Sequence, residues 1–221
     1  MNYANTELEA TFKILKSARI LANYAQEQGF EAESHNARPT YDHMGAILAD
    51  SILQAGMNYR NVVKPRVEAI LVSYADKKSV SDLVDLIASE GLEKLLNWSH
   101  QTKLSRFEKL VTFMMKNQVI TASELKERLL DDSFCTSLQR IDGIGPKTVD
   151  YMKCLVGIDS IAVDRHIKTF AKEAGLEHHD YDFLRNVFCS AADLLSISRR
   201  AFDSWVWNKL SMASSPQQSL F

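Results

Sequence analysis

The sequence is poor in cysteine, and the three cysteines that it has lie far apart. Cys135, Cys154 and Cys189 are the cysteines among 221 residues, and no pair of them has the spacing of metal ligands. This scarcity argues against a disulfide framework and against a zinc site. We expect the three thiols to be small side chains in the interior of a protein that works in a reducing compartment.

Long apolar runs and an excess of one charge are also missing. No apolar stretch reaches the length that crosses a bilayer, and the first residues have no signal-peptide pattern, so we expect a soluble intracellular protein without a membrane partner. The 26 basic and 28 acidic residues leave a net charge of −2. A nucleic-acid surface would therefore need a local concentration of lysine and arginine.

Helical periodicity dominates the pattern that is present. Apolar residues recur at three- and four-residue steps through most of the chain, which predicts an all-α fold. Ser79 and Asp82 have the spacing of a capping box at the start of one helix. Two apolar helix faces are predicted, one formed by Leu8, Phe12, Leu15, Ala18, Leu21 and Ala22, and the other by Met44, Ile47, Leu48, Ser51, Ile52 and Ala55.

Basic residues gather near the start of a helix predicted over residues 104–117. Lys103, Arg106 and Lys109 lie within this short stretch. The ordinary interpretation of such charges is a solvated helix face, and contact with DNA is the alternative.

Residues 133–156 predict two helices joined by a tight turn. Pro146 suits the first position of the second helix, because its φ is preset and it has no N–H to leave without a partner. Gly143 and Gly145 bracket Ile144, so the backbone can take positive φ and approach a ligand without a Cβ in the way. Backbone N–H groups at a helix start form an anion site. An ordinary helix corner, in which Gly145 only caps, is the alternative.

Two residues add reactivity to this hairpin. Lys147 lies in the first turn of the second helix, where the positive end of the helix dipole favours the neutral, nucleophilic amine. Asp164 follows an apolar run and precedes a helical pattern from Arg165 to Ala174, so it is a good N-cap. A capping carboxylate is held in place and still presents a free oxygen, so the capping role and a chemical role are compatible.

The segments GIGPKT and IAVDRH, taken together, resemble the signature of the helix-hairpin-helix DNA glycosylases, the superfamily of endonuclease III and oxoguanine glycosylase. The resemblance implies that Lys147 attacks C1′ of a damaged nucleotide through a Schiff base, and that Asp164 supports the attack. An enzyme of this kind excises the base, expected here to be an oxidised one, and cleaves the strand as an AP lyase. The resemblance also implies DNA contacts by Gly143, Ile144, Gly145, Thr148, Arg165 and His166.

The resemblance further implies two helical subdomains with a cleft between them. Residues 42–158 would form a helical barrel that contains the helix-hairpin-helix at 133–156, and residues 1–38 with 164–212 would form a discontinuous second subdomain. Lys147 and Asp164 would then face each other across the cleft. The expected partner is double-stranded DNA with a damaged base, bound by a monomer in the cytoplasm in association with the nucleoid.

Cofactors are not expected beyond an ion at the hairpin. Endonuclease III carries a four-cysteine iron–sulfur loop near its end, and this chain has no cysteine after Cys189, so the cluster is predicted to be absent. In the resembled family the hairpin backbone holds a monovalent cation, and we expect the same here. No metal site formed by side chains is predicted.

The break at residues 56–60 corresponds to the corner from which the resembled family inserts a side chain into the duplex. Asn58, Tyr59 and Arg60 are the candidates for this wedge. The equal alternative for Asn58 is the capping of the next helix.

The tail at residues 213–221 ends in QQSLF. Gln217, Leu220 and Phe221 resemble the peptide by which bacterial repair and replication proteins bind the sliding clamp, and an extended peptide of this kind can place two apolar side chains in one pocket. A chance match, or a tail packed on its own domain, is the alternative.

Two other functions remain open at this point. One is a monofunctional glycosylase for an alkylated or otherwise modified base, in which Lys147 only contacts DNA. The other is a non-catalytic DNA-binding module, in which Asp164 caps a helix and Lys147 binds a phosphate. The sequence does not identify the base.

Overall fold

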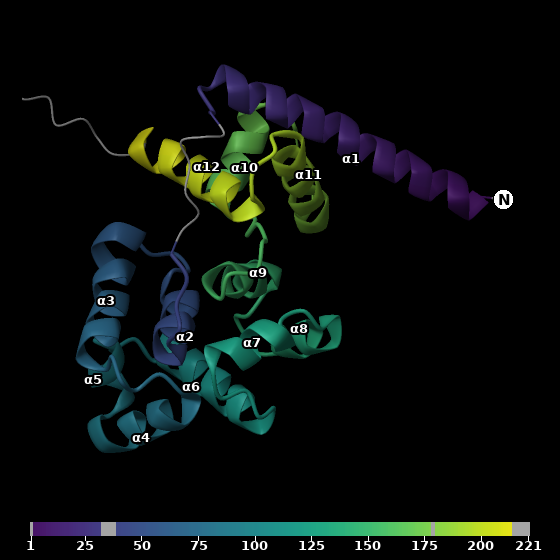
Figure 1. Cartoon of the computed structure of the whole chain (residues 1–221). Helices are drawn as coiled ribbons and strands as arrows, with labels where there is room; N and C mark the ends of the chain where they lie inside the picture. The colour runs from purple at the N-terminus through teal and green to yellow at the C-terminus, as the bar shows by residue number, and fades with distance from the viewer. Residues whose placement is uncertain (1, 32–38, 178–179, 214–221) are drawn as a thin grey trace, which may run out of the picture. The chain divides into compact units, whose positions relative to one another are not determined.

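The computed structural model describes residues 2–31, 39–177 and 180–213, and these residues form helices and loops without a strand (Figure 1). The all-α class predicted from the sequence is therefore confirmed. The chain divides into two compact units, of which unit 1 comprises Met1–Arg38 and Asp159–Phe221, and unit 2 comprises Pro39–Ile158. No helix within the described ranges is both long enough and apolar enough to cross a membrane.

Unit 2 is built around a helix that other helices enclose. Its elements are α2 (Met44–Leu53), the π-helical turn η2 (Tyr59–Val63), α3 (Lys64–Ser73), α4 (Val80–Glu90), α5 (Leu92–Leu96), α6 (Gln101–Lys116), α7 (Ala122–Arg128), α8 (Asp132–Leu138) and α9 (Pro146–Leu155). Helix α2 packs against α3, α4, α6 and α9, and all its residues are buried. The prediction of one inward face was too narrow, because an enclosed helix buries every side, including its polar Asp50. It was wrong for Ala55, which lies beyond the end of α2 and is exposed.

Local sequence sets several helix ends in unit 2. The Ser79 hydroxyl accepts the Asp82 N–H over 3.0 Å, and the Asp82 carboxylate accepts the Ser79 N–H over 3.0 Å. The predicted capping box is thus confirmed. Helix α3 is the helix expected after the break at residues 56–60, and it follows η2 directly with Pro65 in its first turn.

Unit 1 has an aromatic core. Its described elements are α1 (Asn2–Glu27), α10 (Arg165–Glu173), α11 (Tyr181–Leu194) and α12 (Arg199–Ala213). Helix α1 lies along α11, and α12 packs against α10 and α11. Phe170, Phe188, Phe202 and Trp205 fill the centre, where the rings of Phe202 and Trp205 stack with centroids 6.1 Å apart.

The first apolar face predicted for α1 is divided in the structure. Ala18 and Leu21 are fully buried, whereas Leu8, Phe12 and Leu15 have exposed fractions of 67%, 68% and 52%. Ala22 is buried although it follows the exposed Leu15 by seven residues, which returns to within about 20° of the same side of an α-helix, so the two groups differ in their position along α1. The prediction of one continuous inward face was wrong for the first three residues.

Candidate active site

The hairpin of unit 2 joins α8 to α9 through a tight turn. Gly143 has a φ of +82°, which glycine adopts without strain, while Gly145 is extended, with a φ of −103°, as the N-cap of α9. Pro146 occupies the start of α9, as predicted. Ile144 is buried, and its N–H donates to the Ile141 carbonyl over 2.9 Å. The buried Ile144 side chain therefore anchors the turn, and only its backbone is left to meet a ligand.

The two hairpin glycines differ in what lies beside them. A Cβ on Gly143 would overlap the guanidinium of Arg106, whereas a Cβ on Gly145 would have no atom within 4 Å. Arg106 also pairs with Asp142 across 3.4 Å. The sequence predicted positive φ and an open backbone for both glycines. In the structure Gly143 has the positive φ and is covered by Arg106, and Gly145 is extended and open.

This difference predicts opposite effects of one added methyl group. Gly143→Ala should destabilise the protein by about 1–3 kcal/mol, because the side chain requires both a strained φ and displacement of Arg106. Gly145→Ala should leave thermal stability nearly unchanged and weaken DNA binding, because its methyl group would occupy the open approach to the hairpin. Thermal unfolding and a binding titration on duplex DNA measure the two effects. Equal stability of the two variants would contradict this account of Arg106.

Lys147 lies where the sequence predicted, in the first turn of α9. It is partly exposed, and the side chain of its neighbour Thr148 is buried. The N–H of Thr148 donates to the Gly145 carbonyl over 3.0 Å, within the first turn of the helix. Lys147 therefore stands at the positive end of the α9 dipole, as the sequence predicted.

Lys103 does not lie on a solvated helix face. Its ammonium is buried beside α2 and donates to the carbonyl groups of Ile52, Leu53 and Ala55 over 2.9, 2.9 and 2.8 Å. The ordinary interpretation of the basic cluster was therefore wrong for this residue, although Lys109 is exposed. Periodicity gave no signal of this burial, because the acceptors are carbonyl groups about fifty positions away.

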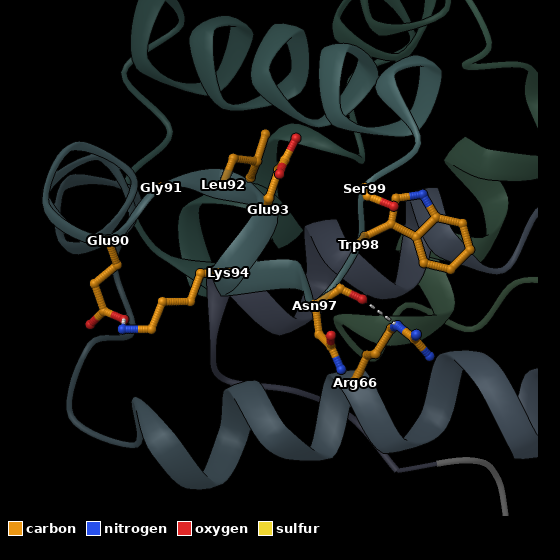
Figure 2. A pocket seen from close by; sticks show the side chains of 9 residues that line it. All are labelled: Arg66, Glu90, Gly91, Leu92, Glu93, Lys94, Asn97, Trp98 and Ser99. Atoms are coloured by element: carbon orange, nitrogen blue, oxygen red, sulfur yellow. Dashed lines mark hydrogen bonds and ion pairs between the residues drawn. The ribbon is translucent and has the colours of Figure 1, made fainter.

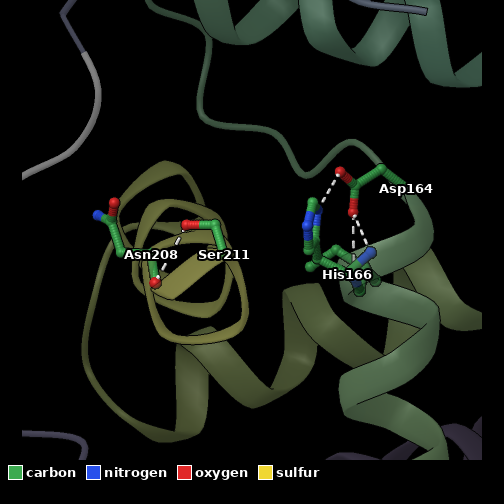
Figure 3. A network of polar contacts seen from close by, with 5 residues as sticks. Asp164, His166, Asn208 and Ser211 are labelled. Atoms are coloured by element: carbon green, nitrogen blue, oxygen red, sulfur yellow. Dashed lines mark hydrogen bonds and ion pairs between the residues drawn. The ribbon is translucent and has the colours of Figure 1, made fainter. Parts of the chain in front are cut away.

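In unit 1, Asp164 is the N-cap of α10, as predicted (Figure 3). Its Oδ1 accepts the N–H groups of His166 and Ile167 over 2.8 and 3.0 Å. Its Oδ2 lies 3.0 Å from Nδ1 of His166. The oxygen that the sequence predicted to remain free is therefore in contact with an imidazole, because the side chain at the second helical position folds back onto the cap.

The remaining candidates at the start of α10 differ in exposure. Arg165 is exposed, while the side chain of His166 is only 13% exposed. The ring of His166 meets the ring of Trp207 at 6.0 Å in an edge-on arrangement. Figure 3 shows this corner beside α12, where the Ser211 hydroxyl donates to the Asn208 carbonyl over 3.2 Å. Arg165 is thus the more accessible cation for contact with a phosphate.

The three wedge candidates also have different surroundings. Asn58 is exposed, and its Oδ1 accepts the N–H of Asn61 over 3.0 Å, so it caps η2. The Tyr59 hydroxyl donates to Asp50 over 3.1 Å, which directs this side chain toward the core of unit 2. Arg60 is exposed. The capping alternative for Asn58 is present in the structure, and Arg60 is the most accessible long side chain of the three.

Asp50 is the centre of a buried polar cluster that the sequence analysis missed. Its side chain is fully buried, and the hydroxyl groups of Tyr41, Tyr59 and Tyr151 donate to it over 3.2, 3.1 and 3.0 Å. Burial, and then the charge of Asp50, raise the pKa of Tyr41 above its ordinary value of 10.0, and the same two causes raise that of Tyr59. The one available signal was a lone carboxylate inside the otherwise apolar segment MGAILADSIL.

The Tyr41 hydroxyl should make stability fall at high pH. A tyrosine whose pKa is raised by folding stabilises the native state below the unfolded pKa, and this contribution is lost as the pH rises above about 10. The difference in unfolding free energy between wild type and Tyr41→Phe should therefore be constant at neutral pH and shrink above pH 10. Urea titrations from pH 7 to 11 measure it, and a difference that is constant across this range would contradict the assignment.

A hollow of 790 Å³ lies elsewhere on unit 2, around the start of α5 (Figure 2). Arg66 lies over the ring of Trp98, 5.2 Å from its centroid, and donates from Nε to the Asn97 carbonyl over 2.9 Å. Glu90 and Lys94 form an ion pair across 2.9 Å on the same rim. The sequence predicted no site residue here, and charges of both signs on the rim leave no net attraction for DNA.

Other predictions concern cofactors, partners and the tail. Among the described residues no group of three or more His, Cys, Asp or Glu side chains could hold a metal ion. Cys135 and Cys154 are buried, and Cys189 is partly exposed. Gln217, Leu220 and Phe221 lie outside the described residues.

The fold of the chain is similar to that of a solved structure. That structure is H. pylori 3-methyladenine DNA glycosylase (MagIII) bound to 1,N6-ethenoadenine, with a TM-score of 0.59 and 21% sequence identity over 95% of this chain and 99% of that chain. No family model matches the chain, and no curated protein sequence matches it. The chain therefore shares the fold of this solved structure.

Proposed function

We propose that the protein is a DNA glycosylase of base-excision repair that flips a damaged nucleotide out of the duplex and excises its base. One combination of features carries this proposal. The fold is similar to that of a DNA glycosylase, and the hairpin has Gly145, beside whose α-carbon there is space, just before Lys147 in the first turn of α9. The carboxylate of Asp164 is held at the start of α10.

In this proposal the hairpin and the exposed cations bind the DNA backbone. The N–H groups at the start of α9 grip a phosphate, together with a monovalent cation on the hairpin backbone. Arg165 adds a phosphate contact from unit 1, and Arg60 or Asn58 fills the gap that the extruded nucleotide leaves. Clamp binding by the tail at residues 213–221 stays a prediction from the sequence.

The proposed chemistry uses Lys147 as nucleophile and Asp164 as an electrostatic partner. The lone pair on Nζ of Lys147 attacks C1′ as the glycosidic C–N bond breaks, and the base leaves with the electron pair of that bond and takes a proton from the amine. The C1′–O4′ bond then breaks, O4′ takes a proton from water, and a protonated Schiff base forms, from which loss of a C2′ proton expels the 3′ phosphate. The Asp164 carboxylate stabilises the positive charge that develops on the sugar.

Two candidate glycosylase activities differ in the base that is excised and in whether the strand is cleaved. The resemblance to oxoguanine glycosylase and endonuclease III favours an oxidised base excised by a bifunctional enzyme. The fold similarity to a 3-methyladenine DNA glycosylase bound to 1,N6-ethenoadenine favours an alkylated purine, excised without strand cleavage if Lys147 only contacts DNA. The non-catalytic alternative agrees with the role of Asp164 as the N-cap of α10, and a base-release assay distinguishes it from the glycosylase.

A base-release assay tests the proposal. Purified protein is incubated with duplexes that contain oxoguanine, an oxidised pyrimidine, ethenoadenine or methylated purines, and the released base is measured by chromatography. We expect release from one class of lesion, and Asp164→Asn should slow it by about a hundredfold, since the substitution removes the charge and keeps an acceptor for the cap. Salt-sensitive binding without release of any base would instead support the non-catalytic module.

A further inference from the structure

The first half of α1 runs past the core of unit 1. Helix α1 has 26 residues and α11, the helix that it lies along, has 14, so α1 is longer by about 18 Å at 1.5 Å per residue. Figure 1 shows its end marked N extending beyond the other helices of unit 1. Contact with the core begins near Lys13, whose ammonium lies over the ring of Phe183, and Ile14, which packs against the core. The side chains of the preceding turns therefore lie outside the core.

These turns carry an apolar stripe that faces the solvent. Leu8, Phe12 and Leu15 are each more than half exposed. They follow one another by four and three residues, so they lie within about 60° of one another on one side of the helix. Arg19 continues the line of the stripe and ends its apolar part. A row of large exposed apolar side chains marks an interaction surface.

The charges beside the stripe change sign along the helix. Glu7 and Glu9 precede Phe12, and the charged residues that follow it in the next two turns are basic. Glu9 and Lys16 are exposed, and neither forms an ion pair with another residue in the described part of the chain. They are seven residues apart, which is about 20° short of two full turns, so both flank the stripe on the same edge.

A second copy of α1 that runs antiparallel matches this pattern. With a two-fold axis beside Phe12, the Leu8 side chain of each copy faces Leu15 of the other, and the two Phe12 rings meet at the centre. Glu9 of each copy then faces Lys16 of the other, so that every contact occurs twice, as in an isologous interface. A parallel copy would instead place like charges side by side, and charges beside an apolar helix seam set its orientation.

We propose that the protein forms a weak symmetric dimer through the stripe of α1, with the two helices antiparallel. The inference is independent of the proposed function, because it uses none of the residues assigned to the DNA site, and it replaces the monomer expected from the sequence. Three large side chains from each copy are fewer than the roughly 20 residues a side of a stable interface. We therefore expect a Kd on the order of 10 µM.

Sedimentation equilibrium of the full chain without DNA tests the dimer. Between about 1 and 200 µM, wild type should pass from monomer to dimer. Phe12→Ala should weaken the dimer at least about tenfold, because it removes the central ring from both copies. Glu108→Lys changes an exposed residue of α6 and should dimerise as wild type does. Phe12 is 68% exposed, so its replacement should leave the thermal stability of the monomer nearly unchanged.

Charge reversal tests the antiparallel arrangement. Glu9→Lys places two lysines at each end of the helix pair, and Lys16→Glu places two glutamates there, so each variant alone should dimerise about tenfold more weakly than wild type. An equal mixture of the two variants should dimerise as well as wild type, because lysine then faces glutamate at both ends.

Three results would overturn the inference. The first is a wild type that stays monomeric at about 200 µM, which would leave the stripe to a partner other than a second copy. The second is a dimer of wild-type strength in Phe12→Ala. The third is a mixture of Glu9→Lys and Lys16→Glu that dimerises no better than either variant alone.

Discussion

Wild type should form a covalent adduct with DNA when sodium borohydride is added, and Lys147→Gln should lose it. Borohydride reduces the C=N bond of a Schiff base to a stable amine, so the adduct reports attack by an amine at C1′. Glutamine has a similar length and no nucleophilic nitrogen, so trapping and strand cleavage at an abasic site should each fall by at least about a thousandfold. The measurement is a denaturing gel of labelled duplex after borohydride treatment.

A control and two other outcomes complete this experiment. Lys116→Gln removes an exposed lysine at the end of α6 and should trap as wild type does. If Lys147→Gln still traps, another amine is the nucleophile and the assignment is wrong. If the wild type releases a base and never traps, Lys147 is a DNA contact, and the monofunctional alternative replaces the lyase.

Asp50→Ala should destabilise unit 2 by about 3–5 kcal/mol, which is the usual range for breaking a buried polar cluster by removing one partner. The substitution leaves the hydroxyl groups of Tyr41, Tyr59 and Tyr151 without their common acceptor in the interior. It also leaves a cavity beside α2, which packs against α3, α4, α6 and α9. Urea unfolding followed by circular dichroism measures the loss.

The chain offers a matched control for this prediction. Asp42 is also an aspartate near the start of unit 2, but its side chain is 82% exposed and pairs with Lys78 on the surface across 3.2 Å. Asp42→Ala should change the unfolding free energy by less than about 1 kcal/mol, because exposed ion pairs contribute little. Asp50→Asn, which keeps one acceptor oxygen, should lie between the two. A loss below 1 kcal/mol for Asp50→Ala would contradict a structural role for the cluster.

The turn that carries Tyr59 connects this cluster to function. Asn58 and Arg60, the exposed wedge candidates, stand on either side of a tyrosine whose hydroxyl is bonded to Asp50. The Asp50 cluster therefore holds the turn in place from inside unit 2. Substitution of Asp50 should for this reason affect the binding of damaged DNA as well as stability.

Features that depend on neighbouring residues could be predicted from the sequence. The Ser79 and Asp82 capping box, Pro146 at the start of α9 and Asp164 as the N-cap of α10 all involve groups within four positions of each other. Helix caps and periodic apolar faces are local properties, so the sequence shows them directly. The all-α class and the proposed pair Lys147 and Asp164 came from such patterns, the pair with the help of a family resemblance.

Other features depend on residues that only folding brings together. Lys103 looked like a surface cation, and it is buried because its three acceptors are carbonyl groups at the end of α2. Gly143 looked open, and Arg106 from α6 covers it. In α1, the group Leu8, Phe12 and Leu15 has the same apolar spacing as the group Ala18, Leu21 and Ala22. Only the second group is buried, in the core that α1 shares with α11. The sequence by itself determined where helices begin and which side chains could react, because those depend on near neighbours. The tertiary structure decided which side chains are buried and which charges meet, because burial and electrostatics depend on distance in space.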